Sequence, residues 1–100
     1  NEEPNQHDLS INSLDINKIN KVVLASRRKP IVKELSNGTI EVFALKKKWT
    51  LKNKYRKAID YIIDNREISP NELTNRGFIK GELINDFLKY LCNSGFVNPY

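Results

Sequence analysis

Basic side chains gather in two short stretches of this 100-residue chain, and binding a polyanion is the chemistry they favour. One stretch of twelve residues contains no acid and seven bases, namely Lys46, Lys47, Lys48, Lys52, Lys54, Arg56 and Lys57. The other is Arg27-Arg28-Lys29. Lys and Arg side chains bind phosphates without reading base sequence. A solvated basic surface without a ligand is the alternative interpretation.

The net charge of +5 and the isoelectric point near 9.4 also favour polyanionic partners. Catalytic constellations are missing from the sequence. His7 is the only histidine, which excludes His-based dyads, triads and multi-His metal sites. Cys92 is interpreted as a buried structural thiol, and Asp60 and Asp64 as partners of nearby bases. We therefore predict no enzyme activity, cofactor or metal for this chain alone.

The single cysteine excludes an internal disulfide and fits a reducing, cytoplasmic setting. No apolar run approaches the roughly 18 residues of a membrane span, and no signal peptide is visible, so no membrane partner is expected. The chain starts at Asn1 and contains no methionine. We expect it to be a fragment of a longer protein or a trimmed form of one.

The clearest structural signal is a helix start at Ser69. Ser69 suits the N-cap, Pro70 fits the first helical position, and Glu72 can accept the N–H of the cap. We predict a short helix from Pro70 to about Asn75, with Gly77 in a left-handed conformation after it.

Longer amphipathic helices are predicted on both sides of this start. The first covers residues 51–65, with Thr50 as N-cap and Trp49 as hydrophobic staple. Its apolar stripe consists of Leu51, Tyr55, Ala58, Ile59, Ile62 and Ile63. The second covers about residues 80–93 and turns inward Leu83, Ile84, Phe87, Leu88 and Leu91.

Residues 31–45 predict a β-hairpin around Asn37-Gly38. A two-residue loop would place Ile31 opposite Ala44, and Glu34 opposite Glu41. This like-charge pair requires either a different register or a fully solvated face. The lysines at 46–48 would end the second strand at an exposed edge. Phe96-Val97 would add a short strand beside the hairpin.

Residues 1–12 are polar and are interpreted as a disordered tail. A helix is predicted over 13–26, because Ile16, Ile19 and Val23 share a helical face. It is interpreted as a linker or a dimerisation helix, with a homodimer through residues 14–24 as one option. Residues 27–100 form the predicted domain.

The order helix, hairpin, helix, short helix, helix, strand predicts an α+β winged helix of the helix-turn-helix type. In such proteins the last helix enters the major groove of DNA. Its exposed face would carry Lys80, Glu82, Asn85, Asp86, Lys89 and Asn93. These charges cancel, which argues against sequence-specific reading of an anionic duplex.

The chain from Arg28 onward resembles the C-terminal winged-helix domain of cupin-type JmjC (ribosomal-oxygenase-like) oxygenases. The similar stretches are residues 28–32, the hairpin, Trp49-Thr50-Leu51, residues 68–73 and residues 88–99. In that family, iron and 2-oxoglutarate bind in a separate cupin barrel through a His-x-Asp…His set, which this chain lacks. The resemblance implies only an accessory role. The regulatory winged-helix region of some methyltransferases is similar as well.

Two functions follow as hypotheses. The first is a non-catalytic winged-helix accessory module that makes protein–protein contacts, as the C-terminal domain of a larger cupin-type protein. The second is a nucleic-acid-binding winged helix whose basic patch contacts DNA or RNA phosphates.

Overall fold

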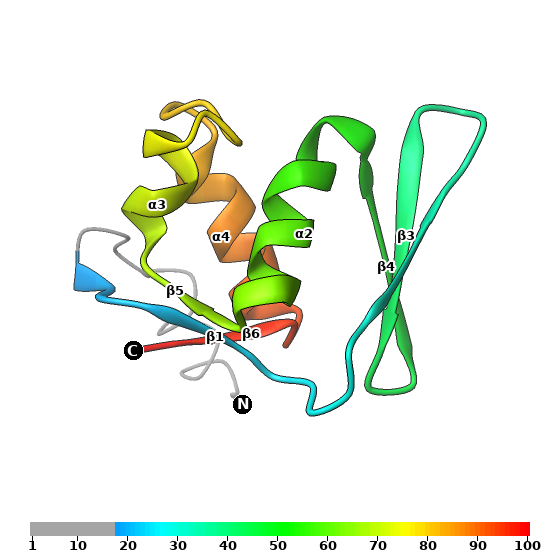
Figure 1. Ribbon diagram of the computed structural model, residues 1–100, viewed down its shortest axis with the longest axis horizontal. Helices are drawn as coiled ribbons and strands as arrows, with labels where there is room; N and C mark the ends of the chain where they lie inside the picture. The colour runs from blue at the N-terminus through cyan, green and yellow to red at the C-terminus, as the bar shows by residue number, and fades with distance from the viewer. Residues whose placement is uncertain (1–17) are drawn as a thin grey trace, which may run out of the picture.

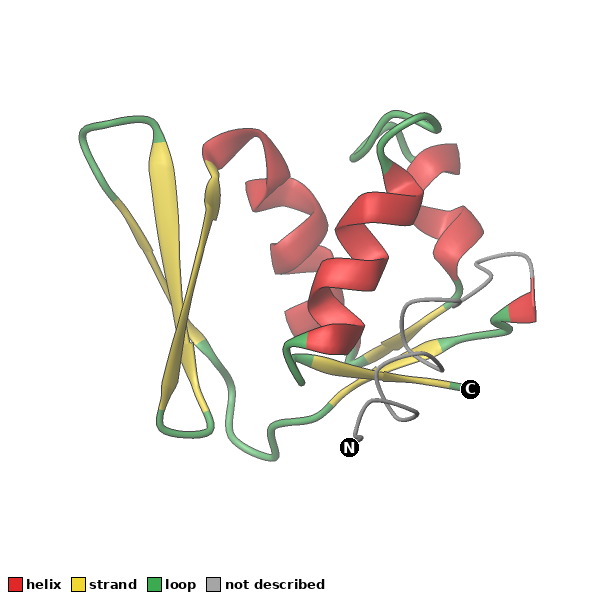
Figure 2. Ribbon diagram, turned by 180° about the vertical axis from the view of Figure 1, so that it is seen from behind, coloured by secondary structure: helices red, strands yellow, loops and turns green. Residues whose placement is uncertain are grey.

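The computed structural model describes residues 18–100, which form a mixed α+β structure. Three α-helices pack with two antiparallel sheets of three strands each. Figure 1 shows the helices in the middle of the molecule, one sheet beneath them and the other standing at one side. Figure 2 shows the same layers from behind. The α+β class predicted from the sequence is confirmed.

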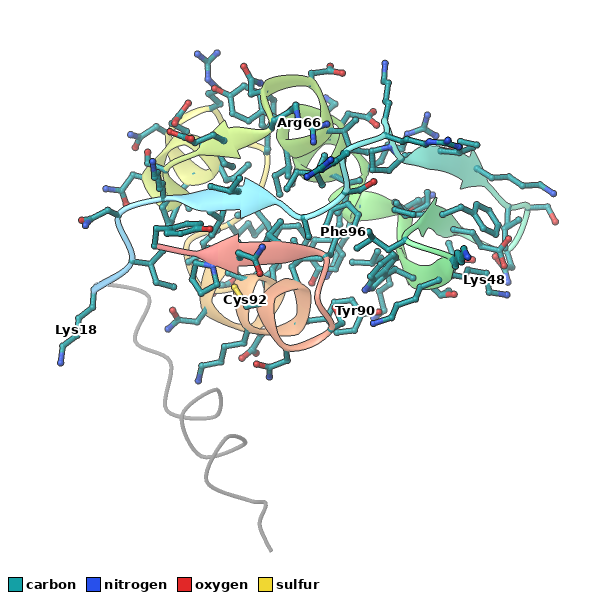
Figure 3. The ribbon with its side chains drawn as sticks, turned by 90° about the horizontal axis from the view of Figure 1, so that it is seen from below. Lys18, Lys48, Arg66, Tyr90, Cys92 and Phe96 are labelled. Atoms are coloured by element: carbon teal, nitrogen blue, oxygen red, sulfur yellow. The ribbon has the colours of Figure 1, made fainter. Side chains whose placement is uncertain are left out.

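The sheet beneath the helices has β1 (Val22–Leu24) as its central strand. It pairs with β5 (Glu67–Ile68) on one side and β6 (Val97–Pro99) on the other. Figure 3 shows the three strands side by side. The prediction that the C-terminal strand lies beside the hairpin is therefore wrong, because the partner of β6 is β1.

The prediction of a helix over residues 13–26 is wrong at Val22–Leu24, because these residues form the strand β1. Val22 and Leu24 are buried on one side of this strand, and both of its edges are hydrogen-bonded. The buried residues alternate with a period of two, and valine is β-branched; both features favour a strand here. Since Val22 and Leu24 lie in the core of the chain itself, they are not available to a dimer interface. The predicted tail 1–12, and residues 13–17 of the predicted helix, lie outside the described residues.

The second sheet is a meander of β2 (Ile31–Glu34), β3 (Thr39–Ala44) and β4 (Lys47–Lys52). The hairpin predicted between the first two strands is present, but its register differs by one residue. Ile31 lies opposite Phe43, and Lys33 opposite Glu41. The loop is therefore longer than two residues, with Gly38 at a φ of 85°. This register replaces the expected like-charge pair with an opposite-charge pair.

The strand β4 corrects the predicted start of the first long helix. Thr50 is no N-cap and Trp49 no staple, because both lie in β4. Trp49 and Leu51 are buried while Lys48, Thr50 and Lys52 are exposed, which is the alternation of a strand. The second strand does end before the three lysines, at Ala44, but the predicted exposed edge is wrong. Lys47 and Lys48 open β4, which makes β3 the central strand of the meander.

After a 3-10 turn, η2 (Asn53–Tyr55), helix α2 (Arg56–Asn65) buries Ala58, Ile59, Ile62 and Ile63. Helix α3 (Pro70–Asn75) begins as predicted, with Ser69 and Glu72 in a capping box. The Ser69 N–H donates to the Glu72 carboxylate at 2.8 Å. Gly77 follows at a φ of 75°.

Helix α4 (Ile84–Asn93) begins four residues later than predicted and buries Phe87, Leu88 and Leu91. Residues 81–83 form turns instead. The meander is joined to this part of the core through Trp49, whose indole N–H donates to Ser94 Oγ at 2.8 Å. The Trp49 ring also meets Phe96 edge to face at 5.1 Å. These contacts fix the position of the meander against the segment that joins α4 to β6.

Candidate polyanion-binding groove

A groove of about 780 Å³ lies where the connection from β1 to β2 approaches the turn between β3 and β4. Figure 1 shows both segments at the lower end of the meander. Its lining includes five of the basic residues singled out in the sequence, namely Arg27, Arg28, Lys29, Lys46 and Lys47. The two basic stretches, separated by sixteen residues along the chain, thus line one groove.

One wall of the groove is a loop tied down by its backbone. The Ser26 hydroxyl is buried and donates to the carbonyl of Arg28 at 2.7 Å. The Arg66 guanidinium, at the end of α2, donates to the carbonyl of Ser26. Pro30 is buried after the loop. The side chains of Arg27 and Arg28 are exposed above this anchored backbone.

The other wall is the tight turn between β3 and β4. Leu45 and Lys46 both have positive φ, of 54° and 61°, as a type I′ hairpin turn requires. The strands on either side pair directly, with Ala44 opposite Lys47. The turn therefore projects Leu45, Lys46 and Lys47 beside the loop.

Between the two walls the groove is apolar. Ile31, Phe43 and Leu45 all line it, and these residues are 66%, 37% and 47% exposed. Ile31 and Phe43 are cross-strand neighbours. None of these three residues was a functional candidate from the sequence. The signal available there was the alternation of β3, in which Phe43 falls on the opposite face from Ile40 and Val42.

The charge of the groove is positive and largely unneutralised. Residues 18–100 contain all seventeen bases of the chain and eight of its twelve acids, a net charge of +9. No acid lines the groove. Lys29 lies 3.9 Å from Asp64, and both side chains are largely exposed, so this pair is weak. Within residues 18–100, no ion pair involves Arg27, Arg28, Lys46 or Lys47.

The remaining basic residues of the 46–57 stretch lie outside the groove. Lys48 pairs with Glu41 at 3.2 Å. Arg56 lies between Glu34 and Asp60, at 3.1 and 3.2 Å. The others are exposed on β4, η2 and α2, and are Lys52, Lys54 and Lys57. This stretch is divided among the β3–β4 turn, β4, η2 and α2, and only its Lys46 and Lys47 line the groove.

The exposed face of α4 carries the side chains expected there, with a shorter helix. Asn85, Asp86 and Asn93 are exposed and Lys89 is half-buried. Lys80 and Glu82 precede the helix. On the helix itself, Asp86 balances Lys89, so this face is electrically neutral, as predicted.

Asp60 and Asp64 lie beside bases, as predicted from the sequence. Asp60 pairs with Arg56, and Asp64 with Lys29. Burial raises the pKa of the Cys92 thiol to about 11. Among residues 18–100, no group of three His, Cys, Asp or Glu side chains is arranged to hold a metal ion.

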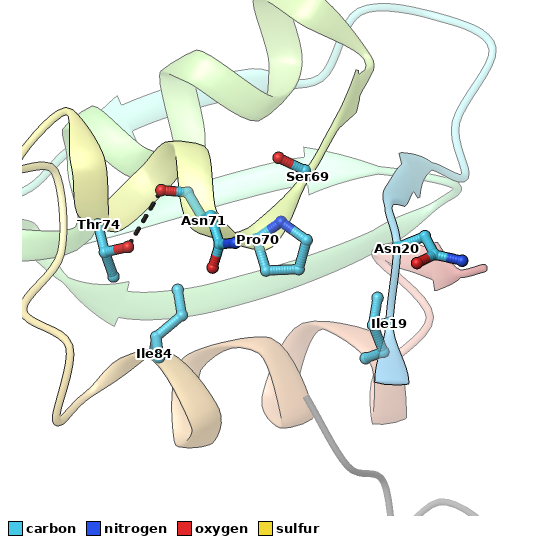
Figure 4. Close-up of a pocket in the computed structure, with 7 residues that line it drawn as sticks. All are labelled: Ile19, Asn20, Ser69, Pro70, Asn71, Thr74 and Ile84. Carbon is cyan, nitrogen blue, oxygen red and sulfur yellow. Dashed lines mark hydrogen bonds between the residues drawn. The ribbon is translucent and has the colours of Figure 1, made fainter. Parts of the chain in front are cut away.

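A second hollow, of about 330 Å³, lies between the approach to β1 and helices α3 and α4 (Figure 4). Its lining is uncharged and consists of Ile19, Asn20, Ser69, Pro70, Asn71, Thr74 and Ile84. The Thr74 hydroxyl is already satisfied by the Asn71 carbonyl at 3.1 Å. Without charged groups this hollow has no particular attraction for an anion. A smaller hollow of about 220 Å³ is lined by two cations, Lys54 and Lys80, against five in the basic groove, so the basic groove is the stronger candidate site.

Comparisons of the chain with protein-family models, curated proteins and solved structures gave no match. In the part of the chain that the structure describes, every helix is too short or too polar to span a bilayer.

Proposed function

We propose that this chain is a non-catalytic binding module whose basic groove holds the phosphate backbone of a nucleic acid. The observation that carries the proposal is the meeting of five cations at one groove with no acidic lining. Neutralising phosphates releases condensed counterions, and this supplies most of the affinity in non-specific nucleic-acid binding. Four of the five cations have no ion-pair partner in residues 18–100, so binding a phosphate would break no such pair.

The neutral face of α4 supports non-specific binding over base reading. A major-groove helix brings its exposed side chains to within contact distance of the duplex. Asp86 in the first turn of α4 would face phosphates there and repel them. We therefore expect substitutions of Asn85 or Lys80 to leave nucleic-acid affinity unchanged.

A salt titration tests the proposal. Binding of a labelled oligonucleotide is measured by fluorescence anisotropy between about 50 and 200 mM salt. Five phosphate contacts predict a slope of log affinity against log salt of roughly −3.5 to −4.5. The variant Arg28→Gln/Lys46→Gln/Lys47→Gln should make this slope shallower by about 2 to 3.

The matched control is Lys52→Gln/Lys54→Gln/Lys57→Gln, which removes the same charge outside the groove. This control should keep most of the affinity. Absence of binding at the lowest salt, or an equal loss in both triple variants, would refute the groove as the site.

An accessory module that contacts a protein is the second candidate, as the resemblance to cupin-type oxygenases implies. The exposed apolar side chains of Ile31 and Leu45 favour it, since apolar patches mark protein contacts. The chain order of α2, β5, α3, α4 and β6 supports a winged-helix assignment. Capture of an upstream cupin domain by this chain, lost in Leu45→Asp, would favour this candidate over the first.

A further inference from the structure

The apolar part of the groove is more than phosphate binding needs. A lysine or arginine holds a phosphate without an apolar surface beside it. Yet Ile31, Phe43 and Leu45 are exposed together between the cationic walls. The register of the meander places Phe43 between Ile31 on β2 and Lys48 on β4. An aromatic side chain thus lies on the outer face of the sheet, with cations along the groove.

The turn that carries Leu45 and Lys46 supports a role for these side chains at the surface. Both residues hold a left-handed backbone conformation, which Asn and Gly adopt at a lower cost than Leu or Lys. Both are exposed, so neither contributes to the core. Folding alone would favour Asn-Gly at this turn. The presence of Leu and Lys at these positions is therefore not explained by folding alone.

A single-stranded nucleic acid fits this combination better than a duplex does. In a duplex the bases are stacked and their flat faces are hidden, so a protein meets phosphates and groove edges. A single strand exposes base faces beside a charged backbone, and its binders combine cationic grooves with aromatic side chains. A strand of this kind offers one phosphate and one apolar face per nucleotide.

We propose that the groove binds single-stranded DNA or RNA, with a base against Phe43 and the adjacent Ile31 and Leu45. The phosphates on either side of that base contact Arg27 and Arg28 on one wall and Lys46 and Lys47 on the other. This inference rests on the proposed function, because it names the form of nucleic acid that the same groove takes.

The test compares one sequence of roughly 12 nucleotides as a single strand and as a duplex, with the full 100-residue chain. Fluorescence anisotropy at one salt concentration should give tighter binding to the single strand. Phe43→Ala should weaken single-strand binding on the order of tenfold and leave duplex binding unchanged. Phe43→Trp should retain single-strand binding.

Tyr90→Ala is the matched control, because Tyr90 is an exposed aromatic residue on α4 that does not line the groove. It should change neither affinity. Circular dichroism melts establish that each variant is folded, and Phe43→Trp keeps an aromatic ring if Phe43→Ala is unstable.

The outcomes separate the two proposals. Equal affinity for both forms, with Phe43→Ala affecting both alike, overturns the single-strand inference and leaves phosphate binding in the groove intact. Binding to neither form overturns both. Binding of an acidic polypeptide such as polyglutamate, with no nucleic acid bound, also overturns both and identifies the groove as a peptide site.

Discussion

The turn at Leu45 and Lys46 allows a direct test of whether these two residues lower the stability of the fold while they contribute to ligand binding. The perturbation is the double substitution Leu45→Asn/Lys46→Gly, which installs the residues that type I′ turns favour. A non-glycine residue in the left-handed region costs roughly 1 to 2 kcal/mol, and this turn contains two. Both side chains are exposed, so their loss removes little core packing.

The expected result is a gain of about 1 to 2 kcal/mol in the free energy of unfolding, less a few tenths for the lost apolar contact of Leu45. The gain comes mainly from Lys46→Gly, because the asparagine at position 45 is itself a non-glycine residue. For a domain of this size, each kcal/mol raises Tm by roughly 4 to 8 °C. Urea titration and thermal melts followed by circular dichroism measure both quantities. The same variant should bind nucleic acid more weakly, because it lacks one groove cation and one apolar side chain.

A matched control is Ser36→Asn, a change at the other loop of the meander that leaves the groove untouched. It should alter neither stability nor affinity appreciably. Lower stability in the Asn-Gly variant would refute the argument that the turn is strained. Higher stability with unchanged affinity would refute the argument that its side chains bind the ligand.

Three further measurements test the packing and titration of the domain. Trp49→Ala should lower the free energy of unfolding by about 3 to 5 kcal/mol, because the buried indole holds the meander against the end of α4. The control Thr50→Ala, at an exposed position, should lower it by about 1 kcal/mol or less. Urea titrations measure both values. Hydrogen bonds from the Ser69 N–H and, to a smaller extent, from the Tyr61 hydroxyl lower the pKa of Glu72. The ionised Glu72 carboxylate therefore contributes its full stabilisation at pH values above the ordinary pKa of Glu, and this contribution is lost as the pH falls through the lowered pKa. In Glu72→Gln, the free energy of unfolding should therefore fall less steeply as the pH is lowered. An unchanged pH dependence would contradict the role given to Glu72. Cys92, with its raised pKa, should react with a disulfide reagent near pH 7 far more slowly than a free thiol, and rapid labelling of the folded chain would contradict its half-buried position.

Elements specified by nearby residues were predictable from the sequence. The start of α3 is the clearest case, because Ser69, Pro70 and Glu72 interact within one turn of helix. The inward faces of α2 and α4 followed from spacing in the same way. The helix boundary at residue 51 failed because Leu51 and Tyr55 have helical spacing by coincidence, while Trp49 and Leu51 already alternate as a strand.

The hairpin was predicted correctly in its position but not in its register. Asn37-Gly38 marked the turn, but the length of the loop decides which side chains face each other. A shift of one residue replaced a Glu–Glu pair by Lys33 opposite Glu41. The unfavourable pair in the expected register was itself a sign that the register was different.

The sequence alone determined the charge of this protein, its short capped helix and the neutral face of its last helix, because each depends on residue types within a few positions. Only the tertiary structure decided that Val22–Leu24 is the central strand of a sheet, since its partners are β5 and β6, more than forty residues away. It also decided that Arg27 and Arg28 share a groove with Lys46 and Lys47. Long-range pairing of strands brings such segments together, and no local pattern records it.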